Sequence, residues 1–490
     1  MVHTVERVLL LVLDGLRPDL VTPDTMPFLT ALHARGTRLA RYCATYPPQT
    51  RVQVTTMCTG THPGRHGILA NVLVLEGAGE DGILDTSDYR QLAALDARTD
   101  GRAVLQSPLA DLLAARGLRL AVAATGSSGS TWLWARTQPY RVVNPRSTFG
   151  IPDLASLRAK LGEPPSPEDD SLALVRYAIA AARDLFLPDP DVAVTVLWLH
   201  EPDATFHFAG LGSPTSIALL RRLDEQLERL FDQLATRGYL DGLLVFVLSD
   251  HGQSTPVLHR SLRELLRNAP PSAALRTLIP AADFLFRLPG TRLPRASELH
   301  TLVDWLLVQD WVGAVLVHPE LAADLPGTLD LRLVWGGELE DCVLERLPVL
   351  AISPRWSTSA NADGVPGLVA ALTEQTALRS THGAGSPFDL RAFALVLGPG
   401  VPAGVTSSVP AGTTDIAPTI AAVLGLDAVT RFSGRVLHEL FDPRWRSPIT
   451  GELHRAGHDR YLRGWRVGEA FYLEELSGEA MAEQERAVTA

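Results

Sequence analysis

Residues 8–15 read Val-Leu-Leu-Leu-Val-Leu-Asp-Gly, and this stretch decides the fold class. Six apolar residues in a row, with no polar residue among them, predict a strand that is buried on both faces of a sheet. Four more β-rich runs stop at a polar residue or a glycine, at residues 118–124, 192–199, 243–248 and 393–397. Parallel strands are typically covered on both sides, so these runs predict a mostly parallel central sheet.

Helical patterns separate these runs. The clearest one lies between Ser216 and Gly238, where apolar residues recur at intervals of three and four. This spacing gives a helix with one buried face, and strands that alternate with such helices predict an α/β fold. In such sheets ligands bind beyond the carboxyl ends of the strands. The residues directly after each strand are therefore the first candidates for a functional site.

The chain is long enough for more than one structural unit. Its 490 residues exceed the size of an average single core. Residues 256–379 consist of shorter segments broken by prolines, and we predict that they form a cap domain inserted into a catalytic core. The two parts of the core are then residues 1–255 and 380–440, and residues 441–490 form a C-terminal extension.

Composition excludes several classes of protein. Hydrophobic residues make up 46% and charged residues 20%, which is typical of a globular protein. The formal net charge is −11 and Lys160 is the only lysine, so no lysine-rich face is present to bind a nucleic acid polymer. No apolar run approaches the roughly 20 residues that cross a bilayer. The three cysteines indicate no disulfide framework, so we expect a cytoplasmic protein without a membrane partner.

Acidic and histidine residues follow the predicted strands. The set comprises Asp14, Asp203, His207, Asp250 and His251, together with the later His382. Carboxylate oxygen and imidazole nitrogen suit zinc or a similar divalent ion, and six such ligands are enough for two sites that each keep an open position. Taken singly, each residue has a plainer interpretation, such as a helix cap for Asp14 or a turn for Asp250 and His251. Their joint occurrence after successive strands favours a metal site.

Short motifs around these residues resemble those of the type I phosphodiesterase/nucleotide pyrophosphatase family of the alkaline phosphatase superfamily. The matching segments are LVLDGLRPD at 11–19, MPFL at 26–29, YPPQT at 46–50, TG at 59–60, HPGRHGI at 62–68, EPD at 201–203, SDHG at 249–252, THG at 381–383 and TDIAPTI at 414–420. The resemblance implies a three-layer α/β sandwich, alkaline phosphatase-like, with a mostly parallel central sheet and an inserted cap domain. It also implies a metal-dependent phosphohydrolase.

The resemblance assigns a role to each candidate ligand. One metal ion is held by residues matching Asp203, His207 and His382, and the other by residues matching Asp14, Asp250 and His251. Thr50 matches the nucleophile and is a further ligand of the second ion. Coordination to a divalent cation, expected to be Zn²⁺, favours the alkoxide of an otherwise poor nucleophile. We therefore expect two divalent ions and attack by Thr50.

Positions near Thr50 bear on substrate binding. In the resembled family an asparagine three residues after the nucleophile supports a phosphoryl oxygen. Here that position is Gln53, which we predict to hold the oxygen from a shifted angle. Thr50 is also expected to cap the helix that starts there. Arg51 and Arg17 could clamp a phosphate bidentately, although a surface position is the commoner fate of an arginine.

The predicted function is hydrolysis of a small phosphate ester, of the phosphodiester or nucleotide-pyrophosphate type, through a covalent phospho-threonine intermediate. Residues 71–76 contain no aromatic side chain to stack a base, so a nucleotide is one candidate substrate among several. A phosphomonoesterase or phosphonate hydrolase on the same core is the alternative, and a binding protein without turnover is a third interpretation. Few cationic side chains accompany the motifs, so we expect diesters to be cleaved faster than monoesters.

Overall fold

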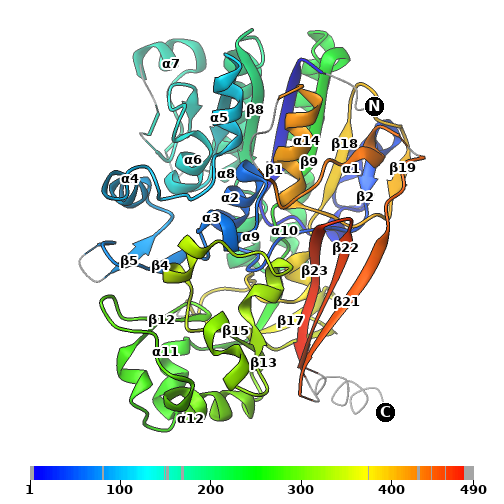
Figure 1. Cartoon of the computed structure of the whole chain (residues 1–490). Helices are drawn as coiled ribbons and strands as arrows, with labels where there is room; N and C mark the ends of the chain where they lie inside the picture. The colour runs from blue at the N-terminus through cyan, green and yellow to red at the C-terminus, as the bar shows by residue number, and fades with distance from the viewer. Residues whose placement is uncertain are drawn as a thin grey trace.

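The computed structural model describes residues 5–79, 82–147, 149–150, 154–166, 170–373, 375–426, 431–442, 444–457 and 460–478. An eight-stranded sheet forms the centre of its larger body (Figure 1). Across this sheet the order is β19 (Val405–Ser407), β2 (Thr37–Leu39), β18 (Ala394–Leu397), β9 (Leu243–Leu248), β1 (Arg7–Leu13), β8 (Val192–Leu199), β6 (Arg119–Ala124) and β7 (Val142–Val143). All five strands that the sequence predicts lie in this sheet.

Most of the sheet is parallel, as the sequence predicts. β1 runs parallel to β8 and β9, and β6 runs parallel to β8 and β7. β18, which the sequence places in the same set, runs antiparallel to β9 and to β2. The reason is the path of the chain, which leaves β9 at the carboxyl edge of the sheet, folds beyond that edge and enters β18 from the same side. The predicted fold class is confirmed, with one inverted strand.

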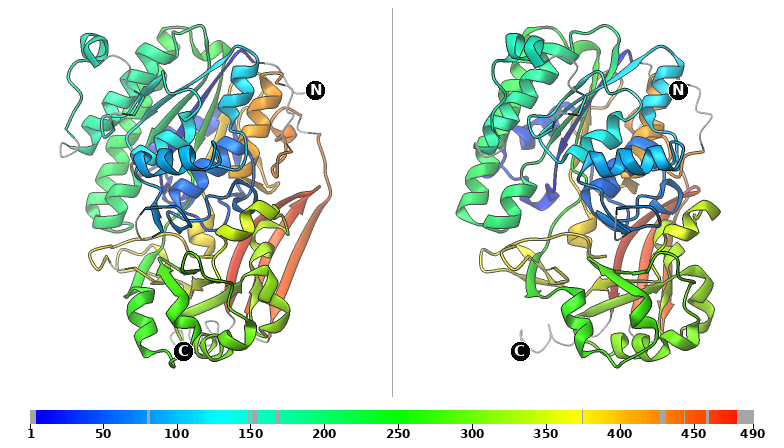
Figure 2. Two further views of the ribbon diagram at one scale, coloured as in Figure 1. Left: turned by 60° about the vertical axis from the view of Figure 1, so that its left-hand side comes forward. Right: turned by 90° about the vertical axis from the view of Figure 1, so that its left-hand side faces the viewer.

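Helices cover both faces of the sheet, which gives the predicted three layers (Figures 1 and 2). Val8, Leu10 and Val12 of β1 point into a buried cluster with α2 (Thr50–Thr59), α5 (Leu109–Ala115), α6 (Ser128–Ala135) and α14 (Ile416–Val423). The alternate residues Leu9, Leu11 and Leu13 belong to a second cluster with α1 (Pro27–Leu32), α8 (Ser171–Ala181) and α10 (Pro214–Thr236). Both faces of β1 are buried, which explains its unbroken apolar run.

The long helix α10 is the one predicted between Ser216 and Gly238. Ser213 accepts a hydrogen bond from Ser216 N and so caps the first turn. Its apolar face, which includes Leu220 and Leu227, packs on the sheet. Within the described part of the chain, no helix is both long and apolar enough to cross a membrane.

A smaller body lies beyond the carboxyl ends of the parallel strands (Figure 1). It contains a five-stranded sheet, in the order β11 (Leu278–Ala281), β12 (Phe284–Arg287), β15 (Leu350–Pro354), β13 (Val312–Val317) and β14 (Leu329–Asp330), covered by α11 (Leu262–Leu265) and α12 (Ala296–Leu307). A three-stranded sheet, β10 (Thr255–His259), β17 (Pro366–Ala371) and β16 (Trp356–Ala360), adjoins it. These elements fall within the predicted cap at residues 256–379, whose standing as a separate domain stays a prediction.

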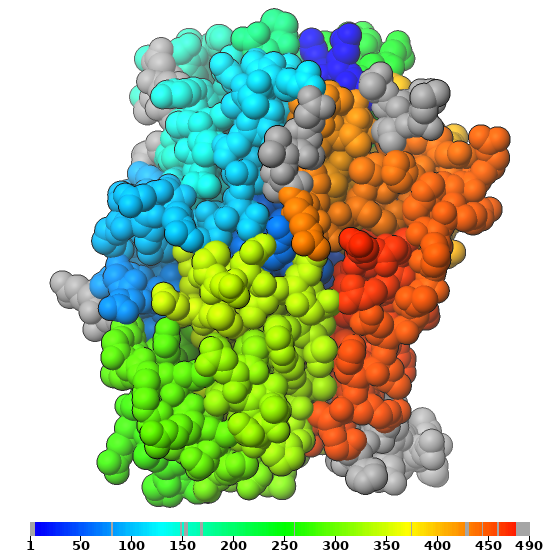
Figure 3. Space-filling model, in the orientation of Figure 1, coloured from blue at the N-terminus to red at the C-terminus, as the bar shows by residue number. Residues whose placement is uncertain are grey.

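Three C-terminal strands form an antiparallel sheet: β21 (Ile449–Ala456), β22 (Arg460–Val467) and β23 (Ala470–Gly478). Leu462, Phe471 and Leu476 from these strands are buried in the same cluster as Val8 of the central sheet. In Figure 3 these orange and red strands lie against both bodies. The segment predicted as a C-terminal extension therefore contributes to the core, and its residues 479–490 lie outside the described residues.

The remaining helices and strands are short. They are α3 (Pro63–His66), α4 (Tyr89–Arg98), α7 (Leu154–Leu161), α9 (Asp203–Ala209), α13 (Pro387–Leu390) and the strand pairs β4 (Val72–Val74) with β5 (Ile83–Asp85) and β3 (Tyr42–Cys43) with β20 (Ala411–Gly412). Of these, α9 and the segment before β4 bring residues to the candidate site described below.

Candidate metal centre and active site

The predicted metal ligands converge at the carboxyl edge of the central sheet. Asp14 directly follows β1, Asp250 and His251 follow β9, Asp203 and His207 lie on α9 just after β8, and His382 lies on the segment that returns to β18. Parallel strands end at the same edge, so residues far apart in the sequence meet there.

Two compact groups of ligand atoms share His251. Asp14, Asp250 and His251 form one group, and Asp203, His251 and His382 form the other, with the ligand atoms of each group within 4.8 Å of one another. His251 Nε2 is 3.5 Å from Asp14 Oδ1 and 3.3 Å from Asp250 Oδ2. The rings of His251 and His382 are stacked with their centroids 3.8 Å apart. The structure thus brings the predicted ligands of both ions into one pocket.

All three histidines turn Nε2 toward the carboxylates. His207 Nδ1 is 2.8 Å from Ser380 O, His382 Nδ1 is 2.8 Å from Pro48 O, and His251 Nδ1 is 3.0 Å from Gly252 O. A carbonyl oxygen can only accept a hydrogen bond, so Nδ1 carries a proton in each ring, and Nε2 is the nitrogen left to coordinate a cation once it is deprotonated. His207 Nε2 lies 3.3 Å from the Asp203 carboxylate. Three imidazoles fixed in this tautomer are arranged as metal ligands are.

Two carboxylate oxygens of this pocket have no hydrogen-bond partner among the described residues. They are Asp14 Oδ1 and Asp250 Oδ2, and both side chains are completely buried. The other oxygen of each carboxylate is satisfied, because Trp198 Nε1 donates to Asp14 Oδ2 and Gly15 N donates to Asp250 Oδ1, each at 3.0 Å. A buried ionised carboxylate costs free energy unless it is paired or coordinates a cation. The orphaned oxygens and the nitrogen ligands therefore fit divalent metal ions.

The charges of the pocket are unbalanced. Burial raises the pKa of Asp250 well above its usual range, and the negative charge of Asp14 raises it further. Burial also opposes the ionisation of Asp203, but the charge of His207 outweighs it and holds the pKa of Asp203 well below its usual range. Burial lowers the pKa of His207, yet the Asp203 carboxylate brings it up to about 9. A cation nearby would favour the ionised form of Asp250.

Gly15 allows the turn after β1 to approach α9 closely. Its φ is +72°, and a Cβ at this position would lie 2.7 Å from Gln253 Nε2 and 3.0 Å from Asp203 Cβ. Gln253 donates a hydrogen bond to Asp203 Oδ1 and accepts one from Ser380. Only glycine fits this position without moving Asp203, so the turn helps to set the spacing between the ligands.

Thr50 faces the metal ligands from the first turn of α2. Its Oγ1 is 3.2 Å from His251 Nε2, and the residue is buried. The prediction that Thr50 caps the helix is wrong, since Gln49 occupies the cap position and no side chain makes a capping hydrogen bond. The Thr50 hydroxyl is instead directed into the pocket.

Gln53, predicted to hold a phosphoryl oxygen, points away from the pocket. Its Oε1 accepts hydrogen bonds from Thr45 N at 3.0 Å and Thr413 Oγ1 at 2.9 Å, and its Nε2 donates to the carbonyl oxygens of Thr45 and Pro47, both at 2.9 Å. The side chain is completely buried. Residue 53 lies three residues further along the helix, about 4.5 Å of rise beyond Thr50. These hydrogen bonds all lie within the protein, so they do not support a contact between this amide and substrate, and that contact stays a prediction.

Asn71 lies beside Thr50 and was not selected as a catalytic residue from the sequence. Its Oδ1 accepts a hydrogen bond from Arg51 N at 3.2 Å, and its backbone N–H donates to Gln49 Oε1 at 2.7 Å. These contacts hold the amide at the N-terminus of α2. The signal in the sequence is its place just after the HGI motif at 66–68.

His200 is a second residue that sequence reasoning missed. Its Nδ1 is 3.4 Å from Asp14 Oδ2 and 3.9 Å from Asp203 Oδ2, and the three residues form a further group of ligand atoms. His200 is the first residue after β8. Its place at the end of a buried strand is the signal that identifies it. The neighbouring motif contains Asp203 and His207, which match the family's ligands, whereas His200 matches none of them.

The two candidate phosphate clamps have different surroundings. Arg17 pairs with Asp19 through two nitrogens and donates to Gln253 O at 3.0 Å and to Pro366 O at 2.8 Å. These hydrogen bonds hold the Arg17 side chain within the protein, so it is not free to clamp a phosphate. The Nε of Arg51 is buried without a hydrogen-bond partner among the described residues.

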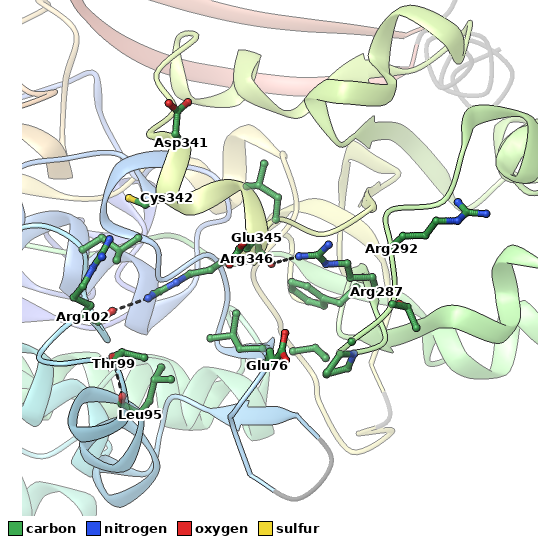
Figure 4. A pocket seen from close by; sticks show the side chains of 18 of the residues that line it. Glu76, Leu95, Thr99, Arg102, Arg287, Arg292, Asp341, Cys342, Glu345 and Arg346 are labelled. Carbon is green, nitrogen blue, oxygen red and sulfur yellow. Dashed lines mark hydrogen bonds between the residues drawn. The ribbon is translucent and has the colours of Figure 1, made fainter.

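A separate cavity of about 870 Å³ lies between the larger and the smaller body (Figure 4). None of the predicted metal ligands is among its lining residues. Arg346 crosses it and donates to the carbonyl oxygens of Gly67, Ala103 and Arg102, while Arg292 at its rim pairs with Glu298. Both arginines have hydrogen-bond partners within the protein, unlike the Asp14 and Asp250 oxygens of the metal pocket.

Residues 8–326 match the family model for type I phosphodiesterase/nucleotide pyrophosphatase, and they include Thr50 and the ligands that follow β1, β8 and β9. The chain belongs to this family. Membership supports hydrolysis of phosphate esters as its activity, and the groups of ligand atoms in the pocket agree with a metal-dependent enzyme. No curated protein sequence matches the chain.

Solved structures share the fold. Murine ectonucleotide pyrophosphatase/phosphodiesterase 5, in an inactive form in complex with AMP, has a TM-score of 0.59 and 16% identity over 87% of this chain and 96% of that chain. A second structure of the murine protein has a TM-score of 0.59 and 17% identity, with the same shares covered. The human protein has a TM-score of 0.57 and 16% identity, again over 87% of this chain and 96% of that one. At these identities the likeness concerns the fold alone.

Proposed function

We propose that this family member is a two-metal hydrolase of phosphodiesters and nucleotide pyrophosphates that acts through a covalent intermediate on Thr50. The observation that carries the proposal is the pair of buried, orphaned carboxylate oxygens on Asp14 and Asp250 beside a threonine hydroxyl. An acidic pocket repels a phosphate ester unless cations invert the local field. With divalent cations on these oxygens, the same pocket attracts the phosphoryl group to Thr50.

The six ligands divide between two ions in our proposal. Asp203, His207 and His382 hold one ion, and Asp14, Asp250 and His251 hold the other, with Thr50 as a further ligand. Nitrogen and oxygen ligands in these numbers suit zinc, and each set leaves an open position. When bound, the ions favour ionisation of the threonine hydroxyl and stabilise charge on the attacking and leaving oxygens.

Thr50 carries the covalent chemistry. Its Oγ1 gives up its proton to solvent and forms a bond to phosphorus while the bond from phosphorus to the leaving oxygen breaks. Water then attacks the same phosphorus and loses a proton to solvent, the bond to Oγ1 breaks, and Thr50 regains its proton. The position of Thr50 at the start of α2, 3.2 Å from His251 Nε2, keeps the hydroxyl in place for both steps.

Asn71, and not Gln53, supports the phosphoryl oxygen of the substrate in our proposal. Because its Oδ1 accepts from Arg51 N, its Nδ2 remains as a donor for a phosphoryl oxygen next to Thr50. An amide held in advance by the fold needs little reorganisation when charge develops in the transition state. Gln53 then has a structural role, since it ties the segment before α2 to the helix.

A nucleotide is the substrate that we favour. The murine structure with the same fold holds AMP, and its inactive form carries an alanine in place of a threonine. Both facts concern that protein, and they support a nucleotide and a functional threonine for this chain as well.

The cytoplasm is the location that we propose. Cys43, Cys58 and Cys342 are all free, with the first two buried and the third exposed. Free thiols of this kind are typical of proteins kept in a reducing compartment.

A trapped intermediate tests the proposal. The zinc-loaded protein is mixed with excess nitrophenyl diester, quenched in acid during the first turnover and digested, and the peptide that contains Thr50 is examined by mass spectrometry. We expect this peptide to gain the phosphoryl part of the substrate. Thr50→Ala should lose both the adduct and most of the turnover while it keeps two ions per chain.

Thr55→Ala is the matched control. Thr55 lies on the same helix, but its hydroxyl donates to Arg51 O at 2.8 Å and does not face the pocket. This variant should still form the adduct. Normal turnover by Thr50→Ala would show that water attacks the substrate directly and would overturn the covalent mechanism.

A further inference from the structure

Arg51 carries a buried guanidinium nitrogen without a partner. It follows Thr50 on α2, and its Nε is closed off from solvent with no hydrogen bond to any described residue. Its guanidinium also forms no ion pair within the described part of the chain. Burial of an unpaired cationic group costs free energy, and such groups in native proteins call for an explanation.

Other arginines around the core have their partners within the protein. Arg17 is held by Asp19 and by two carbonyl oxygens. Arg65 donates to Glu340 Oε1 at 2.9 Å and to Arg431 O at 2.5 Å. Arg51 is therefore the exception among these three, and it is the one that adjoins the proposed nucleophile.

The charges that act on Arg51 are those of Asp85 and of the three carboxylates of the catalytic pocket. Burial lowers the pKa of Arg51, while Asp85 and then Asp14, Asp203 and Asp250 raise it. Asp85 forms no ion pair with Arg51, and its carboxylate accepts a hydrogen bond from Ser87 N at 2.8 Å. The guanidinium therefore lies within the electrostatic field of the metal-binding carboxylates.

The balance of charge changes once metal ions are bound. Two divalent cations exceed the charge of the three carboxylates Asp14, Asp203 and Asp250, and Arg51 adds to this excess. Asp85 offsets only part of it. A substrate that carries a further negative charge near phosphorus is attracted to the Arg51 guanidinium more strongly than a simple diester is.

We propose that Arg51 is a specificity-determining residue that binds a second anionic oxygen of the substrate, beyond the single charge of a simple diester. The inference rests on the proposed phosphohydrolase function. Two kinds of substrate supply such an oxygen, namely the dianionic phosphoryl group of a monoester and the second phosphoryl group of a pyrophosphate link. A planar guanidinium matches the spacing of phosphoryl oxygens. The assignment bears on the expectation that diesters are cleaved faster than monoesters, which rests on the small number of cationic side chains near the motifs.

Three substrates separate these possibilities. Methyl nitrophenyl phosphate is the reference with one charge, nitrophenyl phosphate adds a charge on the scissile group, and a nucleoside triphosphate adds charge on a neighbouring phosphoryl group. We measure kcat/KM for each with zinc-loaded wild type, Arg51→Met and Arg51→Lys. We expect the ratio to the reference to fall about 10-fold or more in Arg51→Met for at least one charged substrate. Arg51→Lys should recover part of that ratio.

The substrate whose ratio falls identifies the oxygen that Arg51 binds. Arg102→Met is the matched control, because Arg102 is an exposed arginine at the cavity of Figure 4 and its loss removes the same charge from the molecule. It should leave every ratio within about twofold. Equal ratios in wild type and in an Arg51→Met protein that still holds two ions would overturn the inference. If wild type cleaves none of the three esters, the proposed function itself fails.

Discussion

None of the predicted metal ligands lines the cavity of Figure 4, and the metal pocket and this cavity differ in how their charges are satisfied. In the metal pocket, oxygens of Asp14 and Asp250 are buried without a hydrogen-bond partner among the described residues. In the cavity, Arg346 has three carbonyl partners and Arg292 has a carboxylate partner. The cavity is spacious, at about 870 Å³, but these two arginines are already bound within the protein.

This difference shows which feature indicates function in this protein. The volume of a cavity depends only on how the two bodies pack. Buried charged groups without a partner, in contrast, indicate that a ligand from outside the chain binds there. The substitutions below test this distinction at sites where it predicts different results.

The largest effect is expected for Asp250→Asn. An amide is a much weaker metal ligand than a carboxylate, so the variant should retain about one ion per chain instead of two. We expect kcat for a nitrophenyl diester to fall by about 10³-fold or more, which corresponds to about 4 kcal/mol of lost transition-state stabilisation. Elemental analysis after dialysis and steady-state kinetics measure the two quantities.

Glu76→Gln in the cavity is the matched control for this prediction. It also converts a carboxylate to an amide, and Glu76 lines the cavity in Figure 4. It should change kcat/KM by less than about twofold, as is usual for a surface substitution without a partner. Equal losses of activity in Asp250→Asn and Glu76→Gln would show that the metal pocket and the cavity do not differ in function.

Asn71→Ala should have the next largest effect. Loss of one preorganised donor to a developing oxyanion commonly costs about 10²–10³-fold in rate. We expect kcat to fall by about 10²-fold, with two ions still bound, because the contacts of Asn71 are with Arg51 N and Gln49 Oε1 and not with the predicted metal ligands. An unchanged kcat would show that the Nδ2 of Asn71 does not reach the phosphoryl group.

The sequence predicted most of this pocket because its ligands follow buried strands. Asp14, Asp250 and His251 are placed by the end of β1 and of β9, and the apolar runs of these strands are readable without a structure. The same logic applies to His200, which was passed over because a longer motif stood next to it. The prediction for Gln53 finds no such support, since its amide is hydrogen-bonded to Thr45 and Pro47 within the protein.

Tertiary contacts between distant chain segments could not be predicted from the sequence. The antiparallel direction of β18 and the burial of Leu462 in the main core each depend on chain segments that are far apart in sequence. The sequence also does not show that Arg51 Nε has no hydrogen-bond partner among the described residues whereas Arg17 is hydrogen-bonded within the protein. Both are arginines next to a motif, and only their neighbours in space separate them.

Gln53→Ala should affect stability more than chemistry. The substitution removes hydrogen bonds to Thr45, Pro47 and Thr413 and leaves several buried groups without a partner. A buried polar group left unpaired costs about 1–3 kcal/mol, so we expect the free energy of unfolding to fall by about 3 kcal/mol. Urea unfolding of the zinc-loaded protein measures this change. A large loss of kcat in a variant of unchanged stability would restore the predicted contact between Gln53 and the substrate.

Asp283 offers the sharpest test of the comparison, because it is a buried carboxyl group outside the metal ligands whose side chain forms no hydrogen bond with the described residues. It lies between β11 and β12 of the smaller body, and its Oδ2 is 3.5 Å from the point where a Cβ on Gly383 would lie. Burial raises the pKa of Asp283 to about 8, and the charge of Asp389 contributes. This carboxyl group can therefore be satisfied by a proton, without a metal ion.

A raised pKa makes the stability of the wild type depend on pH. Between its unfolded pKa of about 4 and its folded pKa of about 8, Asp283 binds a proton more tightly in the folded state, so stability is lost as the pH rises through this window. Asp283→Asn removes the titrating group, and its advantage over wild type should grow by about 2 kcal/mol between pH 6 and pH 8 and then level off. Urea unfolding of both zinc-loaded proteins at pH 6, 7, 8 and 9 measures the difference. Asp304→Asn, at an exposed position on α12, should give a difference that does not change with pH. If Asp283→Asn instead lowers stability by the same amount at every pH and releases a metal ion, Asp283 is a ligand of the pocket, and an unpartnered buried charge in this protein indicates a cation even outside the six predicted residues.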